Sequence, residues 1–207
     1  MTHVEEKWSQ SQHHSLLTTY NLDENSIIFD LGGYVGDWSQ EMSDKYKCNI
    51  YIFEPVKEFY NIIVERFKDN DKVKIFNFGL SDEDILLEIS VNKNQSSFYI
   101  NKTNKLELAK VCNVVTYLCD NVELKDKQID VMKINIEGSE YPLLLSLLQD
   151  PIRTKVKNYQ IQFHEFVPNY LDLYLKIQDL FLSNNYNHTY KYPFVWENFQ
   201  KNNEKSI

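Results

Sequence analysis

The fold is decided by one stretch of sequence, Ser26-Ile-Ile-Phe-Asp-Leu-Gly-Gly-Tyr-Val-Gly36. The apolar run 27–29 is typical of a strand that is buried on both faces, and the acid and glycines after it indicate a tight turn. Glycines let the backbone of such a turn approach a ligand closely. Residues 36–46 then have the pattern of a helix, whose first N–H groups are free to face a ligand. The segment therefore predicts a strand, a ligand-binding loop and a helix in succession.

The alternation of strand and helix continues outward from this segment. Further strands are expected over 49–53, 73–78, 130–137 and 159–165, with two short ones within 186–199. Helices are expected over 56–68, 141–149 and 168–183. Residues 85–100 are interpreted as a hairpin, and residues 5–21 as a helix or arm over the domain. Strands that alternate with helices predict an α/β fold with a parallel sheet and helices on both faces.

Length and charge restrict the function classes. With 207 residues we expect a single domain over 1–207, made of an N-terminal arm (1–24) and an α/β core (25–207). The net charge is −8, from 22 basic and 30 acidic side chains, which argues against an extended phosphate-binding surface and so against nucleic acid as a partner.

The cysteines and the apolar runs indicate the compartment. Cys48, Cys112 and Cys119 have no metal-binding spacing and are expected to be reduced thiols. The chain shows no signal-peptide pattern and no apolar run long enough to span a bilayer. These features predict a cytoplasmic protein.

Polar residues recur at the ends of the expected strands, where an open parallel sheet binds its ligands. These residues are Asp30, Glu54, Asn135, Glu137, His164 and Glu165, joined by Gly79. The carboxylate of Asp30 would repel a pyrophosphate but suits an ammonium group, such as that of a methionine moiety. Glu54 lies at the distance from the glycine loop at which an acid accepts hydrogen bonds from two ribose hydroxyls. The chain lacks Gly-x-Gly-x-x-Gly, which counts against a dinucleotide site.

Lys133 lies inside the expected strand 130–137. Strand alternation places it on the same side as Asn135 and Glu137. A lysine in a sheet that is covered on both faces needs a partner, because burying an unpaired charge is costly. One interpretation is a structural ion pair with Asp30 or Glu140, and the other is a catalytic role.

From about Ile27 to Phe166 the sequence resembles the FkbM family of S-adenosylmethionine-dependent methyltransferases. The matching segments are Ile28-Phe-Asp-Leu-Gly-Gly-Tyr-Val-Gly-Asp37, Phe53-Glu-Pro55, Gly79-Leu-Ser-Asp82 and Ile129-Asp-Val-Met-Lys-Ile-Asn-Ile-Glu-Gly-Ser-Glu140. The first two are shared by many class I methyltransferases, and the last is more specific to this family. The resemblance implies a Rossmann-like, doubly wound and mostly parallel seven-stranded sheet whose last strand is antiparallel.

The resemblance also implies S-adenosyl-L-methionine as the cofactor. It places the methionine part at Asp30, Gly32 and Gly36, the ribose at Glu54, and the adenine side at Gly79, Leu80 and Ser81, while Gly33 and Pro55 belong to the first two of these loops. Family members are generally O-methyltransferases that act on sugars, glycans or secondary metabolites. The family usually has an aspartate at the position of Asn135, and an amide cannot serve as a carboxylate base.

Methyl transfer to a hydroxyl often needs a base to take the proton. Our hypothesis from the sequence is that His164 is this base, oriented by Glu137 or Glu165, and that Lys133 and Asn135 belong to the same catalytic group. The alternatives are a structural histidine, or a divalent ion held by Asn135, His164 and Glu165. We expect a site without metal.

The sequence thus predicts an S-adenosylmethionine-dependent methyltransferase that O-methylates a small-molecule or glycan acceptor. Two rivals stay open, a nicotinamide-dependent oxidoreductase and a non-catalytic S-adenosylmethionine-binding or interaction protein. A nucleic-acid methyltransferase is disfavoured by the acidic balance of the chain. The sequence alone fixes neither the acceptor nor the oligomeric state.

Overall fold

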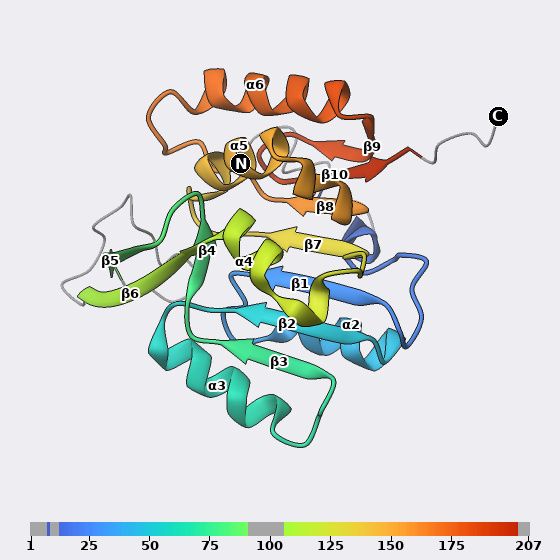
Figure 1. Ribbon diagram of the computed structural model, residues 1–207, viewed down its shortest axis with the longest axis vertical. Coiled ribbons are helices and arrows are strands. Elements are labelled where there is room, and N and C mark those ends of the chain that lie inside the picture. Colours follow the sequence, from blue (N-terminus) through green and yellow to red (C-terminus); the bar gives the residue numbers. More distant parts are fainter. Residues whose placement is uncertain (1–7, 9–12, 91–105, 203–207) are drawn as a thin grey trace.

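The computed structural model describes Trp8 and residues 13–90 and 106–202, and its centre is a seven-stranded sheet (Figure 1). The strands are β1 (Ile27–Leu31), β2 (Asn49–Phe53), β3 (Val73–Phe76), β7 (Val131–Ile134), β8 (Asn158–Ile161), β9 (Tyr186–Tyr192) and β10 (Trp196–Lys201). Their order across the sheet is β3-β2-β1-β7-β8-β10-β9. In this sheet β10 pairs antiparallel with both β8 and β9, and the other described pairings are parallel. The expected doubly wound, mostly parallel sheet with an antiparallel last strand is therefore confirmed.

Helices cover both faces of this sheet. They are α2 (Asp37–Tyr46), α3 (Lys57–Phe67), α4 (Val114–Asp120), α5 (Glu140–Gln149) and α6 (Tyr170–Ser183), with 3₁₀ turns η1 (His13–Leu17), η3 (Val122–Leu124) and η4 (Pro151–Lys155). Met42 of α2 and Ile63 of α3 pack on one face, while Leu118 of α4, Leu144 of α5 and Phe181 of α6 pack on the other. Within the described part of the chain, no helix combines the length and the apolar character needed to cross a bilayer.

The strand β1 lies in the middle of the sheet, and all five of its residues are buried. From β1 the chain builds outward through β2 and β3 and then returns to β7 on the other side of β1 (Figure 1). The strand order therefore reverses between β1 and β7. In such sheets ligands bind in the crevice outside the carboxyl ends of the strands at this point.

A second, three-stranded sheet stands beside the carboxyl ends of the main one. It consists of β4 (Gly79–Ser81), β6 (Leu106–Asn113) and β5 (Ile85–Ser90), in that spatial order. Of the hairpin expected over 85–100, the described part is β5, which pairs antiparallel with β6. The expected partner strand 97–100 lies outside the described residues.

Element boundaries also differ from the sequence-based expectation. The strand expected over 73–78 ends at Phe76, because the amide of Asn77 turns to donate to the carbonyls of Glu54 and Pro55, both at 3.0 Å. The strands expected over 130–137 and 159–165 are shorter and end at Ile134 and Ile161. Helix α4 was not expected from the sequence; the side chain of Asn113 caps it by accepting from the N–H of Thr116 at 3.0 Å. Residues 5–21 were expected to form a helix or arm, and within this range the structure describes the 3₁₀ turn η1.

The glycine loop after β1 offers a test of the close approach between β1 and β7. Gly32 has a φ of +80°, and a Cβ at this position would lie 2.0 Å from the carbonyl oxygen of Asn135. We expect Gly32→Ala to lower the free energy of unfolding by roughly 1–3 kcal/mol or more, from backbone strain and the backbone clash together. Gly79→Ala is the matched control, since its Cβ would have no neighbour closer than 3.7 Å. Urea unfolding of both variants checks this, and equal stabilities would contradict the geometry.

Candidate functional site

A cleft of about 1170 Å³ opens at the carboxyl ends of β1, β2, β7 and β8. It is lined by most of the residues that the sequence analysis singled out, namely Gly32, Gly33, Glu54, Pro55, Gly79, Leu80, Ser81, Lys133, Asn135, Glu137 and His164. Asp30 and Gly36 are not among its lining residues. The structure thus brings segments from both ends of the chain together in one cavity at the predicted edge of the sheet.

The glycine loop is drawn in tightly against β2. The N–H groups of Gly32 and Gly33 both point at the carbonyl oxygen of Phe53, at 3.0 and 3.4 Å. A Cβ on Gly33 would lie 2.3 Å from a methyl carbon of Ile52. Gly36, with a φ of +85°, starts α2, and a Cβ there would meet the ring of Phe67 at 3.1 Å. Gly36 therefore lets the loop pack on α3, and its expected contact with the methionine part is not supported by its position outside the cleft lining.

Asp30 lies behind the glycine loop rather than in the cleft. Its side chain is fully buried, with one oxygen 2.7 Å from Nζ of Lys133 and the other accepting from the hydroxyl of Ser39 at 2.6 Å. Lys133 also donates to the carbonyl of Gly32 at 3.0 Å. Asp30 is not among the residues that line the cleft, so its expected contact with a methionine ammonium has no support in this geometry and stays a prediction. Of the two interpretations of Lys133, the structure shows the ion pair with Asp30.

Glu54 ends β2 and is the buried acid of the cleft. Its two carboxylate oxygens accept from the backbone N–H groups of Tyr34 at 2.8 Å and Val56 at 2.9 Å. Burial raises the pKa of Glu54 to about 7, against the opposite effect of these two hydrogen bonds. A carboxylate has about four acceptor positions, so Glu54 keeps capacity for two hydroxyl donors. This donor–acceptor pattern is the one that a ribose requires.

The segment after β3 forms the wall next to Glu54. Leu80 and Ser81 of β4 are buried, and the Ser81 hydroxyl donates to Asp82 at 2.9 Å. Val56 and Phe59, together with Ile89 of β5, continue this wall as an apolar cluster. An apolar slot beside a buried carboxylate suits a flat aromatic base such as adenine.

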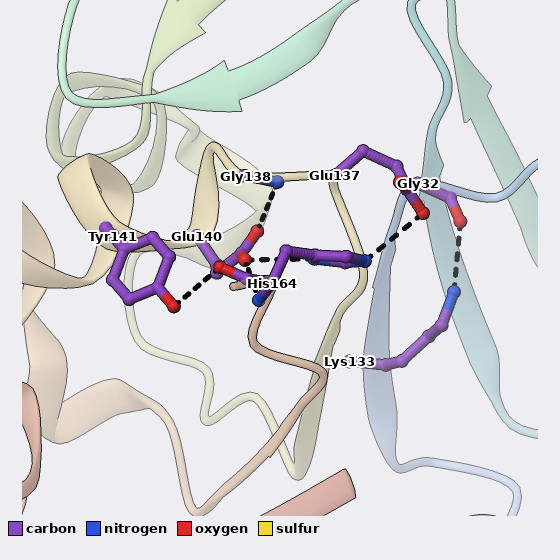
Figure 2. Close-up of polar contacts among 7 residues, drawn as sticks. All are labelled: Gly32, Lys133, Glu137, Gly138, Glu140, Tyr141 and His164. Atoms are coloured by element: carbon purple, nitrogen blue, oxygen red, sulfur yellow. Dashed lines mark hydrogen bonds and ion pairs between the residues drawn. The ribbon is translucent and has the colours of Figure 1, made fainter. Parts of the chain in front are cut away.

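Three charged side chains meet after β7 and β8, on the other side of β1 from Glu54 (Figure 2). The ring of His164 lies between two carboxylates, with Nε2 at 3.3 Å from Glu137 and Nδ1 at 3.0 Å from Glu140. Burial alone would lower the pKa of His164, but the hydrogen bonds and charges of Glu137 and Glu140 outweigh it and raise the pKa to about 9. His164 is therefore an imidazolium near neutral pH, and both of its nitrogens carry protons.

The contacts of His164 bear on two of the sequence-based hypotheses. Its two ring nitrogens contact the carboxylates of Glu137 and Glu140, and not the suggested metal partners Asn135 and Glu165. Glu165 itself is exposed. Among the described residues, no group of three or more histidines, cysteines and acids is placed to hold a metal ion. Glu137 is next to His164 as expected, but the second acid on the ring is Glu140 and not Glu165.

Glu140 is the site residue that sequence reasoning missed. It belongs to the quoted segment Glu137-Gly-Ser-Glu140, yet it was considered only as a partner for Lys133. The sequence signal for Glu140 was its position three residues after Glu137, at the expected start of a helix. An acid at this position can accept hydrogen bonds from the free backbone N–H groups just before the helix. Asn135 also lines the cleft, and its buried Oδ1 has no hydrogen-bond partner among the described residues.

Comparisons with known proteins agree with this geometry. The family model for the methyltransferase FkbM domain matches residues 30–192. A search of curated proteins finds no significant match.

Solved structures resemble the chain in fold at low sequence identity. A protein described as an rRNA methylase from Streptococcus thermophilus has a TM-score of 0.52 and 13% identity over 91% of this chain and 93% of that one. A Streptococcus mutans protein assigned as a methyltransferase, solved in complex with S-adenosylhomocysteine, has a TM-score of 0.53 and 12% identity, with 96% and 97% covered. A protein assigned as an rRNA methylase from Clostridium thermocellum has a TM-score of 0.58 and 8% identity, with 95% and 97% covered. At these identities they show the fold.

The raised pKa of Glu54 has a consequence for stability. Between its ordinary pKa of 4.5 and about 7, the folded state binds a proton that the unfolded state has lost, so the stability from this group is lost as pH rises through 7. We expect Glu54→Gln to remove this loss and to be at least as stable as the wild type at pH 8. Thermal unfolding between pH 5 and 8 measures it, with Glu65→Gln on the exposed side of α3 as control. Parallel pH profiles of wild type and Glu54→Gln would contradict the assignment.

Proposed function

Because the chain belongs to the FkbM methyltransferase family, we propose that it transfers the methyl group of S-adenosylmethionine to a hydroxyl oxygen of a sugar, glycan or secondary metabolite. One observation carries the proposal. The buried acid Glu54 follows β2, and the charged pair of Glu137 and His164 follows β7 and β8, so the two groups line one cleft on the two sides of β1. A cofactor bound on the Glu54 side of β1 would direct its reactive part toward the other side.

The chain's own residues fit this cofactor. Gly32 and Gly33 pack without side chains against Asn135 and Ile52, and both line the cleft, so the backbone of the loop borders the space for the cofactor. Glu54 offers its remaining acceptor positions to the ribose hydroxyls, and the wall around Leu80 offers an apolar surface to the base. Asp30 acts from behind the loop, since its ion pair with Lys133 fixes the carbonyl of Gly32. The methionine end then lies toward Asn135, whose free Oδ1 can accept from a ligand donor.

The acceptor end has the means to take a proton. When bound, S-adenosylmethionine supplies a methyl group on a positively charged sulfur, and a hydroxyl that receives it must lose its proton. Glu137, His164 and Glu140 together hold two carboxylates and one imidazolium. This group can therefore accept a proton at Glu137 without gaining net positive charge. Because both ring nitrogens of His164 carry protons, the role of base first assigned to His164 passes to Glu137, and His164 orients this carboxylate.

The charges along the cleft favour an uncharged acceptor. Among its described lining residues are Asp37, Glu41, Asp82 and Glu83, whereas its cations Lys133 and His164 are already paired with carboxylates. Such an excess of negative charge disfavours phosphate groups and hence nucleic acid near the reacting atom. The hydroxyl of a neutral sugar or a secondary metabolite meets no such penalty.

Cofactor binding is the first test. Isothermal titration should give micromolar binding of S-adenosylmethionine and S-adenosylhomocysteine and no binding of NAD. Glu54→Ala should weaken both by about tenfold or more, because two charge-assisted hydrogen bonds are lost. Glu65→Ala, on the exposed side of α3, should bind as the wild type does. Binding of NAD alone would favour the oxidoreductase, and no binding of any of the three would favour an interaction protein.

Turnover tests the acceptor end separately. With labelled S-adenosylmethionine and a panel of neutral glycosides and hydroxylated metabolites, we expect His164→Ala to lower kcat by about 100-fold or more. The affinity for S-adenosylhomocysteine should change by less than about threefold, since His164 is not at the ribose end of the cleft. Unchanged turnover on an accepted substrate would remove His164 from the mechanism.

A further inference from the structure

Glu140 is a fully buried carboxylate that is not itself part of the cleft lining. It is the first residue of α5, and each of its oxygens is engaged. One oxygen accepts from the backbone N–H of His164 at 2.8 Å and contacts the ring nitrogen Nδ1 of the same residue at 3.0 Å. The other accepts from the backbone N–H of Gly138 at 2.9 Å. Figure 2 shows these contacts converging on the one side chain.

The two oxygens of Glu140 act on two different segments. Gly138 belongs to the turn after β7 that carries Glu137, and His164 lies just after β8. Glu137 has a φ of +51°, a conformation that residues other than glycine rarely adopt, and Gly138 follows with a φ of +104°. A hydrogen bond from Gly138 therefore supports a turn that is strained at the residue facing His164. Through one carboxylate, both members of the Glu137–His164 pair are held.

The charge of Glu140 needs a cation nearby, because an ionised carboxylate buried without one is very costly. Among the described residues, its contacts supply one charge partner, the ring of His164, besides the two backbone N–H groups. The hydroxyl of Tyr141 donates to the carbonyl of His164 at 2.9 Å, so the backbone of the histidine is held on both sides. The ring also lies 5.2 Å from that of Phe166.

We propose that Glu140 is a positioning residue, which holds Nδ1 of His164 so that Nε2 is directed at Glu137 and the cleft, and which supports the turn that presents Glu137. The contribution of this arrangement to methyl transfer rests on the proposed function. The arrangement itself does not, because Glu140 acts on the ring of His164 whether or not an acceptor is found.

Nuclear magnetic resonance of the histidine rings tests the proposal without any substrate. In the wild type we expect Nδ1 of His164 to stay protonated through neutral pH and the ring to titrate at a pKa of about 9. In Glu140→Gln the pKa of His164 should fall by about one unit or more, because one of its two carboxylates has become a neutral amide.

The chain contains a matched control for this substitution. Glu197 of β10 is also fully buried and also binds a histidine ring, with Nε2 of His188 at 2.9 Å. Glu197→Gln should leave the titration of His164 unaltered. It carries the same chemical change at the same depth of burial, so it separates the loss of Glu140 from a general effect of removing a buried charge.

Each outcome bears on Glu140 itself. An unchanged pKa and ring protonation of His164 in Glu140→Gln would overturn the proposal. If that variant does not fold, the wild-type spectrum decides, since a ring that titrates near 6.5 or lacks a proton on Nδ1 would also overturn it. Where a hydroxyl acceptor is found, kcat should fall about tenfold or more with the affinity for S-adenosylhomocysteine unchanged. If no acceptor is methylated, the proposed function fails while the spectra still report on Glu140.

Discussion

The buried ion pair between Asp30 and Lys133 is the constraint on which the rest of the site depends. It joins β1 to β7 at 2.7 Å, where the strand order of the sheet reverses. Removing two charges from water is expensive, and here the hydroxyl of Ser39 and the carbonyl of Gly32 complete the pair's hydrogen bonds. The same lysine thereby fixes the glycine loop against β7. The close approach of Gly32 to Asn135 follows from this arrangement, and with it the position of the cleft.

Two further buried carboxylates show how their partners determine their charge. Glu54 is bonded only to the backbone N–H groups of Tyr34 and Val56, and burial dominates, so its pKa is raised to about 7. Glu140 is bonded to His164, and the mutual attraction of the two groups raises the pKa of the histidine instead. Glu54 is thus an acid that is about half protonated near neutral pH. His164 and Glu140 form a buried pair of opposite charge.

The sequence predicted the sheet well because its signals are local. Short apolar strands such as Ile27–Leu31 and Asn49–Phe53 end in polar residues or glycines, and alternate with helices whose apolar residues share one face. Glu54, Glu137 and His164 were found for the same reason, since strand ends meet at one edge of a parallel sheet.

The features that were missed depend on pairings between distant segments. The pairing of 85–90 with 106–113 skips a stretch of chain that itself has strand-like alternation. The burial of Asp30 depends on Lys133, which is far away in sequence, and alternation alone left two partners open for that lysine. Glu140 was likewise a possible partner of Lys133, and only the position of β8 beside β7 shows that it contacts His164 instead.

Because residue 135 is an asparagine, the charges of Glu137, His164 and Glu140 matter more for the proposed proton transfer. An aspartate there would add a third carboxylate beside Glu137 and Glu140 and could itself take a proton. The amide of Asn135 cannot take that proton, and its buried Oδ1 has no hydrogen-bond partner among the described residues. A proton that leaves an acceptor in this cleft must then go to Glu137, the one carboxylate of the charged group that lines the cleft. The imidazolium beside Glu137 orients this carboxylate, and Glu140 offsets that positive charge from within the core. Glu140 thus supplies a negative charge that the neutral amide of Asn135 does not.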